Sequence, residues 1–144
     1  MRIVWKDNPL PMHPNAMPAA LAARAAHEQG KFWEFHDKVF GNQQKMTHDD
    51  MVAYARELKL DVSRFEKSIT QGSGKPQIDA DAAEAKSLGA TGTPAFFING
   101  KYLSGAKPFN EFANVINAEL TRLKLPVPPA AAAPQAPAAG AGGR

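Results

Sequence analysis

Residues 91–104 constrain the fold of this chain more than any other stretch. They are Thr-Gly-Thr-Pro-Ala-Phe-Phe-Ile-Asn-Gly-Lys-Tyr-Leu-Ser, so an apolar run is followed at once by Asn99-Gly100. Asn-Gly between two β-prone runs is the strongest short signal for a β-hairpin, because both residues accept the positive φ angles of a tight turn. The stretch predicts strands over 95–98 and 101–104, with a proline turn before the first.

The rest of the chain is mostly helical in pattern. Residues 2–6 (Arg-Ile-Val-Trp-Lys) are the exception, since β-branched and aromatic residues favour a short strand there. Apolar spacing, together with caps at Asn15 and at Thr47 with Asp50, predicts six helices. These helices cover about 15–29, 31–40, 47–59, 61–71, 76–88 and 108–123. The predicted fold class is therefore α/β (α+β), predominantly helical by residue count.

The composition excludes several kinds of chemistry. The chain has 144 residues and no cysteine, so it forms no disulfide, thiolate metal site or cysteine nucleophile. Its formal net charge of +3 is spread along the sequence without a basic cluster, which argues against nucleic-acid binding. No apolar run reaches the roughly 18 residues of a membrane-spanning helix, and the first residues do not form a signal peptide.

Other candidate sites are weak. The chain has four histidines, and their spacing is not that of a metal site: His13, His27, His36 and His48. We therefore expect neither a metal nor a cofactor. We interpret Asp79, Asp81 and Glu84 as a solvated helix face rather than as paired catalytic carboxylates. The aromatic residues within 32–40 are compatible with a peptide groove, but their helical spacing favours a place in the core.

The layout of residues 91–100 resembles the cis-proline loop of thioredoxin-fold proteins. Residues 3–5, followed by the proline-rich residues 9–16, resemble the connector after the second strand of the DsbA-like family. The Gly30-Lys31-Phe32-Trp33 junction and a helical insert at about 15–89 are also similar to that family. The resemblance covers roughly residues 2–123. It implies a partial DsbA-like thioredoxin-fold domain over 1–125, followed by an Ala/Pro/Gly-rich tail over 126–144 that we expect to be disordered.

The resemblance implies a thioredoxin-like fold without its first strand and first helix, the unit that carries Cys-x-x-Cys in the family. It also implies a cis peptide bond before Pro94, which turns the backbone N–H and C=O of Thr93 outward. A substrate peptide then pairs with them as an added strand would. The expected substrate-binding residues are therefore Gly92, Thr93 and Pro94, and no catalytic residue is expected in the chain.

The missing unit has structural consequences. In the family layout the absent strand lies between residues 2–6 and 95–98, and each buried unpaired backbone group costs about 1–3 kcal/mol. Three outcomes are compatible with this gap: an unstable fragment, a homodimer formed by edge-strand pairing, or a longer protein in which Met1 is an internal start. We favour the last.

Three candidate functions of different classes follow from these observations. The first is a fragment or degenerate member of the DsbA-like thiol–disulfide oxidoreductases, inactive as it stands, whose full-length parent acts in the periplasm or cell envelope. The second is a redox-dead, chaperone-like module that holds an extended polypeptide. A third places the chain near the glutathione-transferase kappa branch, which uses a bound glutathione thiol. The cellular compartment of this chain cannot be predicted from its sequence alone.

Overall fold

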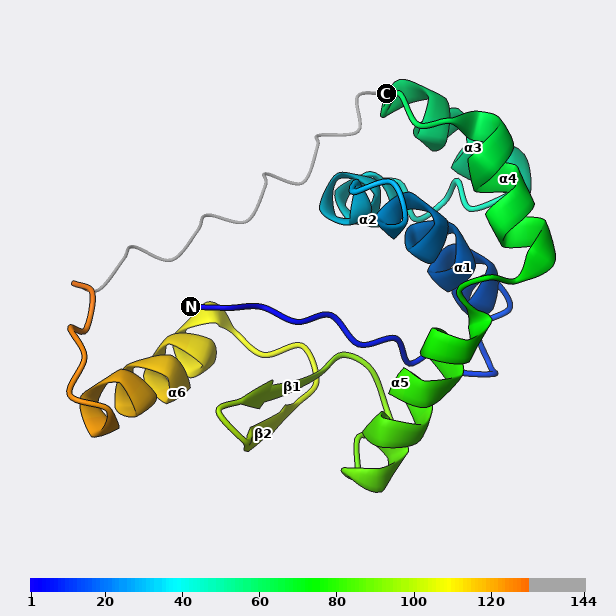
Figure 1. The fold of residues 1–144 in the computed structure, drawn as a ribbon. Coiled ribbons are helices and arrows are strands. Elements are labelled where there is room, and N and C mark those ends of the chain that lie inside the picture. Colours follow the sequence, from blue (N-terminus) through cyan, green and yellow to red (C-terminus); the bar gives the residue numbers. More distant parts are fainter. Residues whose placement is uncertain (130–144) are drawn as a thin grey trace, which may run out of the picture. The chain divides into compact units, whose positions relative to one another are not determined.

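The computed structural model describes residues 1–129, which divide into two compact units, Met1–Thr91 and a second unit that begins at Gly92. In this part of the chain six helices and one hairpin follow one another (Figure 1). The elements are α1 (Ala16–His27), α2 (Phe32–Gly41), α3 (His48–Glu57), α4 (Val62–Gln71), α5 (Lys75–Ser87), β1 (Ala95–Ile98), β2 (Lys101–Ser104) and α6 (Phe109–Arg122). The predominantly helical fold is therefore confirmed.

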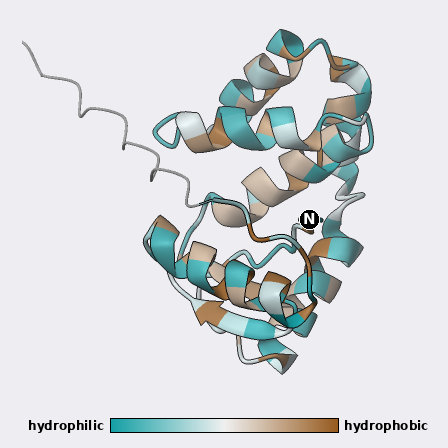
Figure 2. Cartoon of the chain, turned by 90° about the vertical axis from the view of Figure 1, so that its left-hand side faces the viewer, coloured by the Kyte–Doolittle hydropathy of each residue, from teal (hydrophilic) through white to brown (hydrophobic). Residues whose placement is uncertain are grey.

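The first unit packs α1 against α2, α3 and α4. Ala22, Ala25 and Ala26 of α1 are buried, and their small side chains let the neighbouring helices approach closely. Phe35 of α2 and Phe65 of α4 are fully buried, with ring centroids 5.5 Å apart. Burial of a Phe side chain contributes about 1.5–3 kcal/mol, so this pair anchors the core. Apolar and polar residues alternate along the helices, as Figure 2 shows.

Side-chain caps define the start of two helices. Thr47 and Asp50 form the predicted capping box at α3, with the Thr47 hydroxyl accepting from the Asp50 N–H at 3.2 Å. The Asp61 carboxylate accepts from the Arg64 N–H at 2.9 Å and caps α4. The predicted cap at Asn15 is wrong, because its side chain makes no capping hydrogen bond. Its backbone is already helical (φ −87°, ψ −6°), whereas a capping residue is usually extended.

The strand predicted over residues 2–6 is also wrong. Within the described residues the sheet contains only β1 and β2, and residues 2–6 form no ladder. A strand needs a hydrogen-bonded neighbour, and this segment is held by other contacts. The Asp7 N–H donates to the Asp81 carboxylate at 3.2 Å, and Lys6 Nζ lies 3.0 Å from the same carboxylate. The start of the chain is therefore anchored to α5 through one buried acid.

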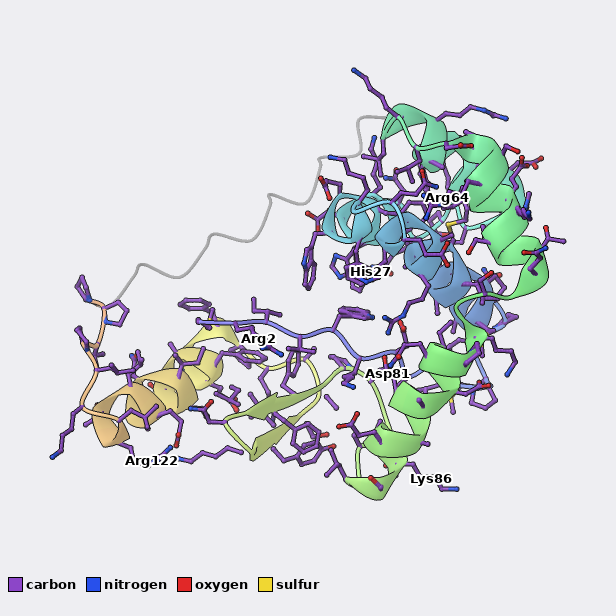
Figure 3. All side chains as sticks on the ribbon, viewed as in Figure 1. Arg2, His27, Arg64, Asp81, Lys86 and Arg122 are labelled. Atoms are coloured by element: carbon purple, nitrogen blue, oxygen red, sulfur yellow. The ribbon has the colours of Figure 1, made fainter. Side chains whose placement is uncertain are left out.

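Asp81 lies at the centre of a buried ionic cluster, so the prediction of a solvated face is wrong for this residue. Its side chain is only 2% exposed, and Figure 3 shows it on the side of α5 that faces the N-terminal segment. Arg24 bridges two acids, with Nε 2.6 Å from Asp7 and Nη2 2.5 Å from Asp81. Arg24 lies 57 residues earlier in the chain, so the residue pattern within α5 does not reveal that Asp81 has a buried partner.

The cluster keeps Asp81 ionised. Burial by itself raises the pKa of the Asp81 carboxyl, but hydrogen bonds from Lys6, the Asp7 N–H and Gln77 outweigh it. The pKa therefore lies below its ordinary value. A buried charge without a partner costs several kcal/mol, so the ionised form depends on these donors and on Arg24.

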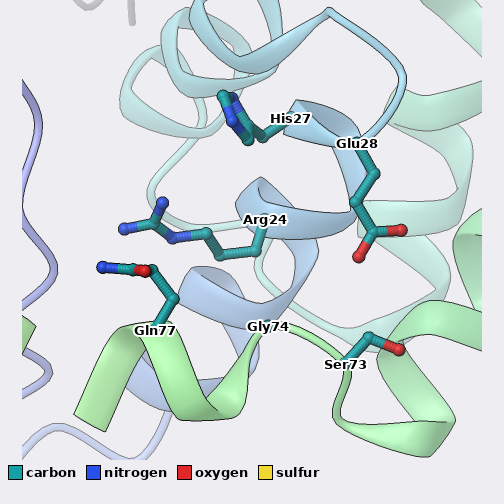
Figure 4. Close-up of a pocket in the computed structure, with 6 residues that line it drawn as sticks. All are labelled: Arg24, His27, Glu28, Ser73, Gly74 and Gln77. Carbon is teal, nitrogen blue, oxygen red and sulfur yellow. The ribbon is translucent and has the colours of Figure 1, made fainter. Parts of the chain in front are cut away.

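Helix α5 approaches α1 so closely that Gly74 has no room for a side chain. A Cβ placed on Gly74 would lie 2.6 Å from the Arg24 Cβ, far inside a normal contact. Figure 4 shows Gly74 at the start of α5, opposite Arg24, with Gln77 on the next turn. The missing side chain lets α5 come close enough for Asp81 to reach Arg24.

The second unit consists of the hairpin and α6. The hairpin strands pair antiparallel around the predicted turn, where Asn99 and Gly100 have φ angles of 48° and 82°. Phe96 packs edge-on against Phe112 of α6, with ring centroids 4.7 Å apart. Helix α6 therefore covers one face of the hairpin. Most of the predicted tail, residues 130–144, lies outside the described residues, and 126–129 form no helix or strand.

Gly74→Ala is expected to destabilise the first unit by about 1–3 kcal/mol, because the added methyl group overlaps the Arg24 side chain. Urea unfolding followed by circular dichroism measures the free energy of unfolding. Gly41→Ala is the matched control, since nothing lies within 4 Å of a Cβ placed there. Equal stability of the two variants would contradict the close approach of α5 and α1.

Candidate functional site

The segment Gly92–Thr93–Pro94 leads into β1 and lies on the surface. All three residues are exposed, and the peptide bond between Thr93 and Pro94 is cis. The Pro94 carbonyl accepts a hydrogen bond from the Gly105 N–H at 2.8 Å. This bond extends the pairing of β1 and β2 by one residue and attaches the end of the segment to the hairpin.

Thr93 carries a backbone donor and acceptor that no described residue uses. Among residues 1–129, no protein group forms a hydrogen bond with its N–H or its C=O. Gly92 adds no bulk beside them, and nothing lies within 4 Å of a Cβ placed on it. The three residues that the family resemblance implies for substrate binding are therefore exposed, and the backbone groups of Thr93 are unpaired within the described residues.

The open edge of β1 continues from this segment. In an antiparallel pair, every second residue directs its backbone groups away from the neighbouring strand. The hydrogen bond between Pro94 and Gly105 sets the phase of this alternation. Ala95 and Phe97 are therefore the residues of β1 that point away from β2. A row of backbone groups unpaired within the described sheet runs on from Thr93.

Glu119 of α6 holds the hairpin turn on the helix. Its side chain is 5% exposed, and its carboxylate lies 2.9 Å from both Lys101 Nζ and Arg122 Nη2. Asn99 Nδ2 donates to it at 3.4 Å. The hydrogen bonds from Arg122 and Lys101 outweigh desolvation and lower the pKa of Glu119 from 4.5 to about 2. The carboxylate is therefore charged at neutral pH and holds both the turn and the helix.

The aromatic residues of α2 divide between core and surface. Phe35 is fully buried, but Trp33 and Phe40 are 45% and 55% exposed, so the prediction of a core stripe is wrong for these two. They surround Trp5, whose ring centroid lies 6.5 Å from Trp33 and 6.1 Å from Phe40. His36 stacks on Phe40 at 4.2 Å and packs within this aromatic surface. The sequence pattern missed the surface because Trp5 reaches α2 from outside the helix.

The Gly92–Thr93–Pro94 segment offers backbone hydrogen bonds and apolar contacts rather than catalytic side chains. In the described part of the chain, no three His, Asp or Glu residues gather closely enough to hold a metal ion. None of the helices in that part combines the length and hydropathy needed to cross a bilayer. The groups that this segment offers for hydrogen bonding are therefore the backbone N–H and C=O of Thr93.

The family of the chain follows from comparison with known protein families. Residues 4–117 match the DSBA-like thioredoxin domain. The chain therefore belongs to this family, and it does so without any cysteine. The predicted resemblance is confirmed, and disulfide chemistry within the chain alone is excluded.

Several curated relatives are much longer proteins. The chain is 42% identical over 113 residues to Na(+)/H(+) antiporter NhaA 3 of Salinispora tropica, an alignment that covers 76% of the chain and 17% of the relative. It is 39% identical over 107 residues to antiporter NhaA 1 of Salinispora arenicola, covering 74% and 16%. For the NhaA antiporter of Herminiimonas arsenicoxydans the identity is 39% over 97 residues, covering 67% and 16%. The chain thus spans 16–17% of the length of these relatives.

Acid is expected to weaken the second unit through Glu119. Because its pKa is about 2 in the fold and ordinarily 4.5, its stabilising contribution is present above the ordinary pKa. That contribution is lost as the pH falls from about 5 towards about 2. Thermal melts over this range should show a smaller acid-induced loss of stability for Glu119→Gln than for the wild type.

Asp49→Asn removes a fully exposed carboxylate, with 101% side-chain exposure, and is the matched control. It should keep the acid dependence of the wild type. Parallel stability curves for the wild type and Glu119→Gln would show that Glu119 does not stabilise the second unit.

Proposed function

We propose that this chain acts as a polypeptide-binding module of the DSBA-like type, in which Gly92, Thr93 and Pro94 hold the backbone of an extended polypeptide. The observation that carries the proposal is the unpaired backbone N–H and C=O of Thr93, on an exposed segment next to the open edge of a strand. Strand addition obtains its affinity from main-chain hydrogen bonds. It needs no thiol, which suits a chain without cysteine.

Family membership supports a finer version of this proposal. In it, the chain is the part of a thioredoxin fold that follows the first strand and helix, and any disulfide exchange uses cysteines from outside the chain. A parent of this kind acts in the periplasm or cell envelope, where disulfides persist. The module then presents the polypeptide, and the external thiols react with it.

The chain by itself is expected to be redox-inactive. Disulfide exchange requires a thiolate to attack a disulfide sulfur, and the chain contains no thiol. Turbidity in an insulin-reduction assay should rise at the rate of the dithiothreitol background, with a thioredoxin as positive control. A rate above that background would contradict the expectation.

Two substitutions of Thr93 separate backbone recognition from side-chain recognition. Thr93→Pro removes the N–H donor and is expected to weaken binding of a fluorescent, carboxymethylated unfolded polypeptide by about tenfold or more. Thr93→Ala keeps both backbone groups, so its dissociation constant should stay within about twofold of the wild-type value. Fluorescence anisotropy measures both constants.

Thermal melts of both variants provide the control for folding. Wild-type affinity in a folded Thr93→Pro variant would show that the polypeptide binds elsewhere. Equal losses in the two variants would point to the threonine side chain and would also contradict the proposal. A loss confined to Thr93→Pro supports it.

The relatives favour a second function. The chain matches roughly one sixth of the length of proteins named as Na(+)/H(+) antiporters. We infer that it serves as a DSBA-like module beside a transporter of this kind. The test is co-purification of the chain with the Salinispora tropica relative after deletion of the matching segment from that relative. Retention of the chain supports the association, and its absence from the purified transporter argues against it.

A further inference from the structure

The Gly92–Thr93–Pro94 segment has one backbone attachment within the described residues. The Gly105 N–H donates to the Pro94 carbonyl at 2.8 Å, and no other backbone hydrogen bond among residues 1–129 reaches residues 92–94. Gly105 directly follows β2, so this bond continues the register in which Ala95 lies opposite Ser104. The attachment of the segment to the hairpin therefore depends on a single backbone donor.

Proline makes this donor necessary. Opposite residues in a hydrogen-bonded antiparallel pair normally exchange two N–H···O bonds. Pro94 has no N–H and can only accept, so its pair with Gly105 keeps one bond. Without the Gly105 N–H, the pair would have no backbone hydrogen bond at all.

The proline ring passes this restraint on to Thr93. The ring locks the φ angle of a proline at about −65°, so the Thr93 carbonyl cannot rotate freely relative to Pro94. The carbonyl of Pro94 itself is held by Gly105. Together, the ring and the hydrogen bond restrict the direction in which Thr93 presents its backbone groups.

Gly105 donates from a backbone conformation that favours glycine. Its φ angle is 81°, in the left-handed region where a Cβ is costly. Nothing lies within 4 Å of a Cβ placed on Gly105, so the constraint is the backbone conformation rather than space. Asparagine accepts this region better than most residues, and Asn99 has a φ angle of 48° in the same hairpin.

We propose that Gly105 is a positioning residue for polypeptide binding, because its N–H holds Thr93 in the orientation that an extended polypeptide needs. This inference rests on the proposed function of residues 92–94. It extends the functional site to a residue that follows β2. Gly105 acts through Pro94 rather than by contact with the polypeptide.

Three glycine variants test the role of Gly105 by fluorescence anisotropy with the carboxymethylated polypeptide. Gly105→Ala strains the backbone and should raise the dissociation constant by about fivefold or more. Gly105→Asn tolerates the positive φ angle and should stay within about twofold of the wild type. Gly100→Ala is the matched control. Gly100 has a φ angle of 82°, with nothing within 4 Å of a Cβ placed on it, but it lies at the other end of the hairpin.

Thermal melts separate positioning from general stability. Gly100→Ala and Gly105→Ala should lower the melting temperature by similar amounts, whereas only Gly105→Ala should weaken binding. Equal losses of affinity in these two variants would overturn the proposal, since weakening of the hairpin would then explain both. Wild-type affinity in a folded Gly105→Ala variant would also overturn it, as would equal losses in Gly105→Ala and Gly105→Asn.

Amide NMR spectra without polypeptide distinguish this inference from the proposed function. The Thr93 amide signal should shift in Gly105→Ala and stay in place in Gly100→Ala, and an unshifted signal in Gly105→Ala would overturn the positioning role. A wild-type chain that binds no polypeptide would instead overturn the proposed function, and the Thr93 shift still reports whether Gly105 positions this residue. If Gly105→Ala does not fold, hydrogen exchange of the wild type replaces it. The Gly105 amide should then exchange more slowly than the Thr93 amide, and equal exchange would contradict the proposal.

Discussion

A β-strand carries hydrogen-bonding groups along both edges, and β1 pairs along only one of them within the described residues. This constraint underlies the chemistry of the second unit. A two-stranded hairpin is marginal by itself, so it needs the helix packed on one face. The contact between Phe96 and Phe112 and the ion pairs of Glu119 provide that support. Helix α6 thus stabilises the hairpin, and the edge of β1 next to Thr93 has no paired strand within the described residues.

The first unit holds its N-terminal segment by ion pairs rather than by strand pairing. Its N-terminal segment has strand-like residues but no strand to pair with, and a buried ionic cluster holds it instead. Arg24 joins Asp7 to Asp81, and the absence of a side chain at Gly74 brings the two helices close enough for this contact. Leaving a buried charge without its partners is costly, so the ion pairs of Arg24 with Asp7 and Asp81 hold this segment in place. The exposed Trp5 ring then joins α2 in the aromatic surface.

The proposed function requires only one task of this DSBA-like domain, the holding of an extended polypeptide, because the chain contains no thiol. Breaking or forming a disulfide needs a thiolate, which this chain does not have. Holding an extended polypeptide needs only accessible backbone groups, which Thr93 offers. The family match over residues 4–117 and the partial coverage of long antiporter relatives both suit a module that contributes binding to a larger system.

Features that depend on near neighbours in the chain could be predicted from the amino-acid sequence. The capping box at Thr47 and the turn at Asn99-Gly100 are built from residues within a few positions of one another, so their patterns predict them. The cis bond before Pro94 was expected from the family resemblance instead. The absence of cysteine likewise excludes thiol–disulfide exchange by the chain alone. The burial of Asp81 could not be predicted in this way, because its partner Arg24 lies 57 residues away and is brought close by the packing of the helices. The tertiary structure also decided that residues 2–6 form no strand, since a ladder needs a neighbour that propensity alone does not supply.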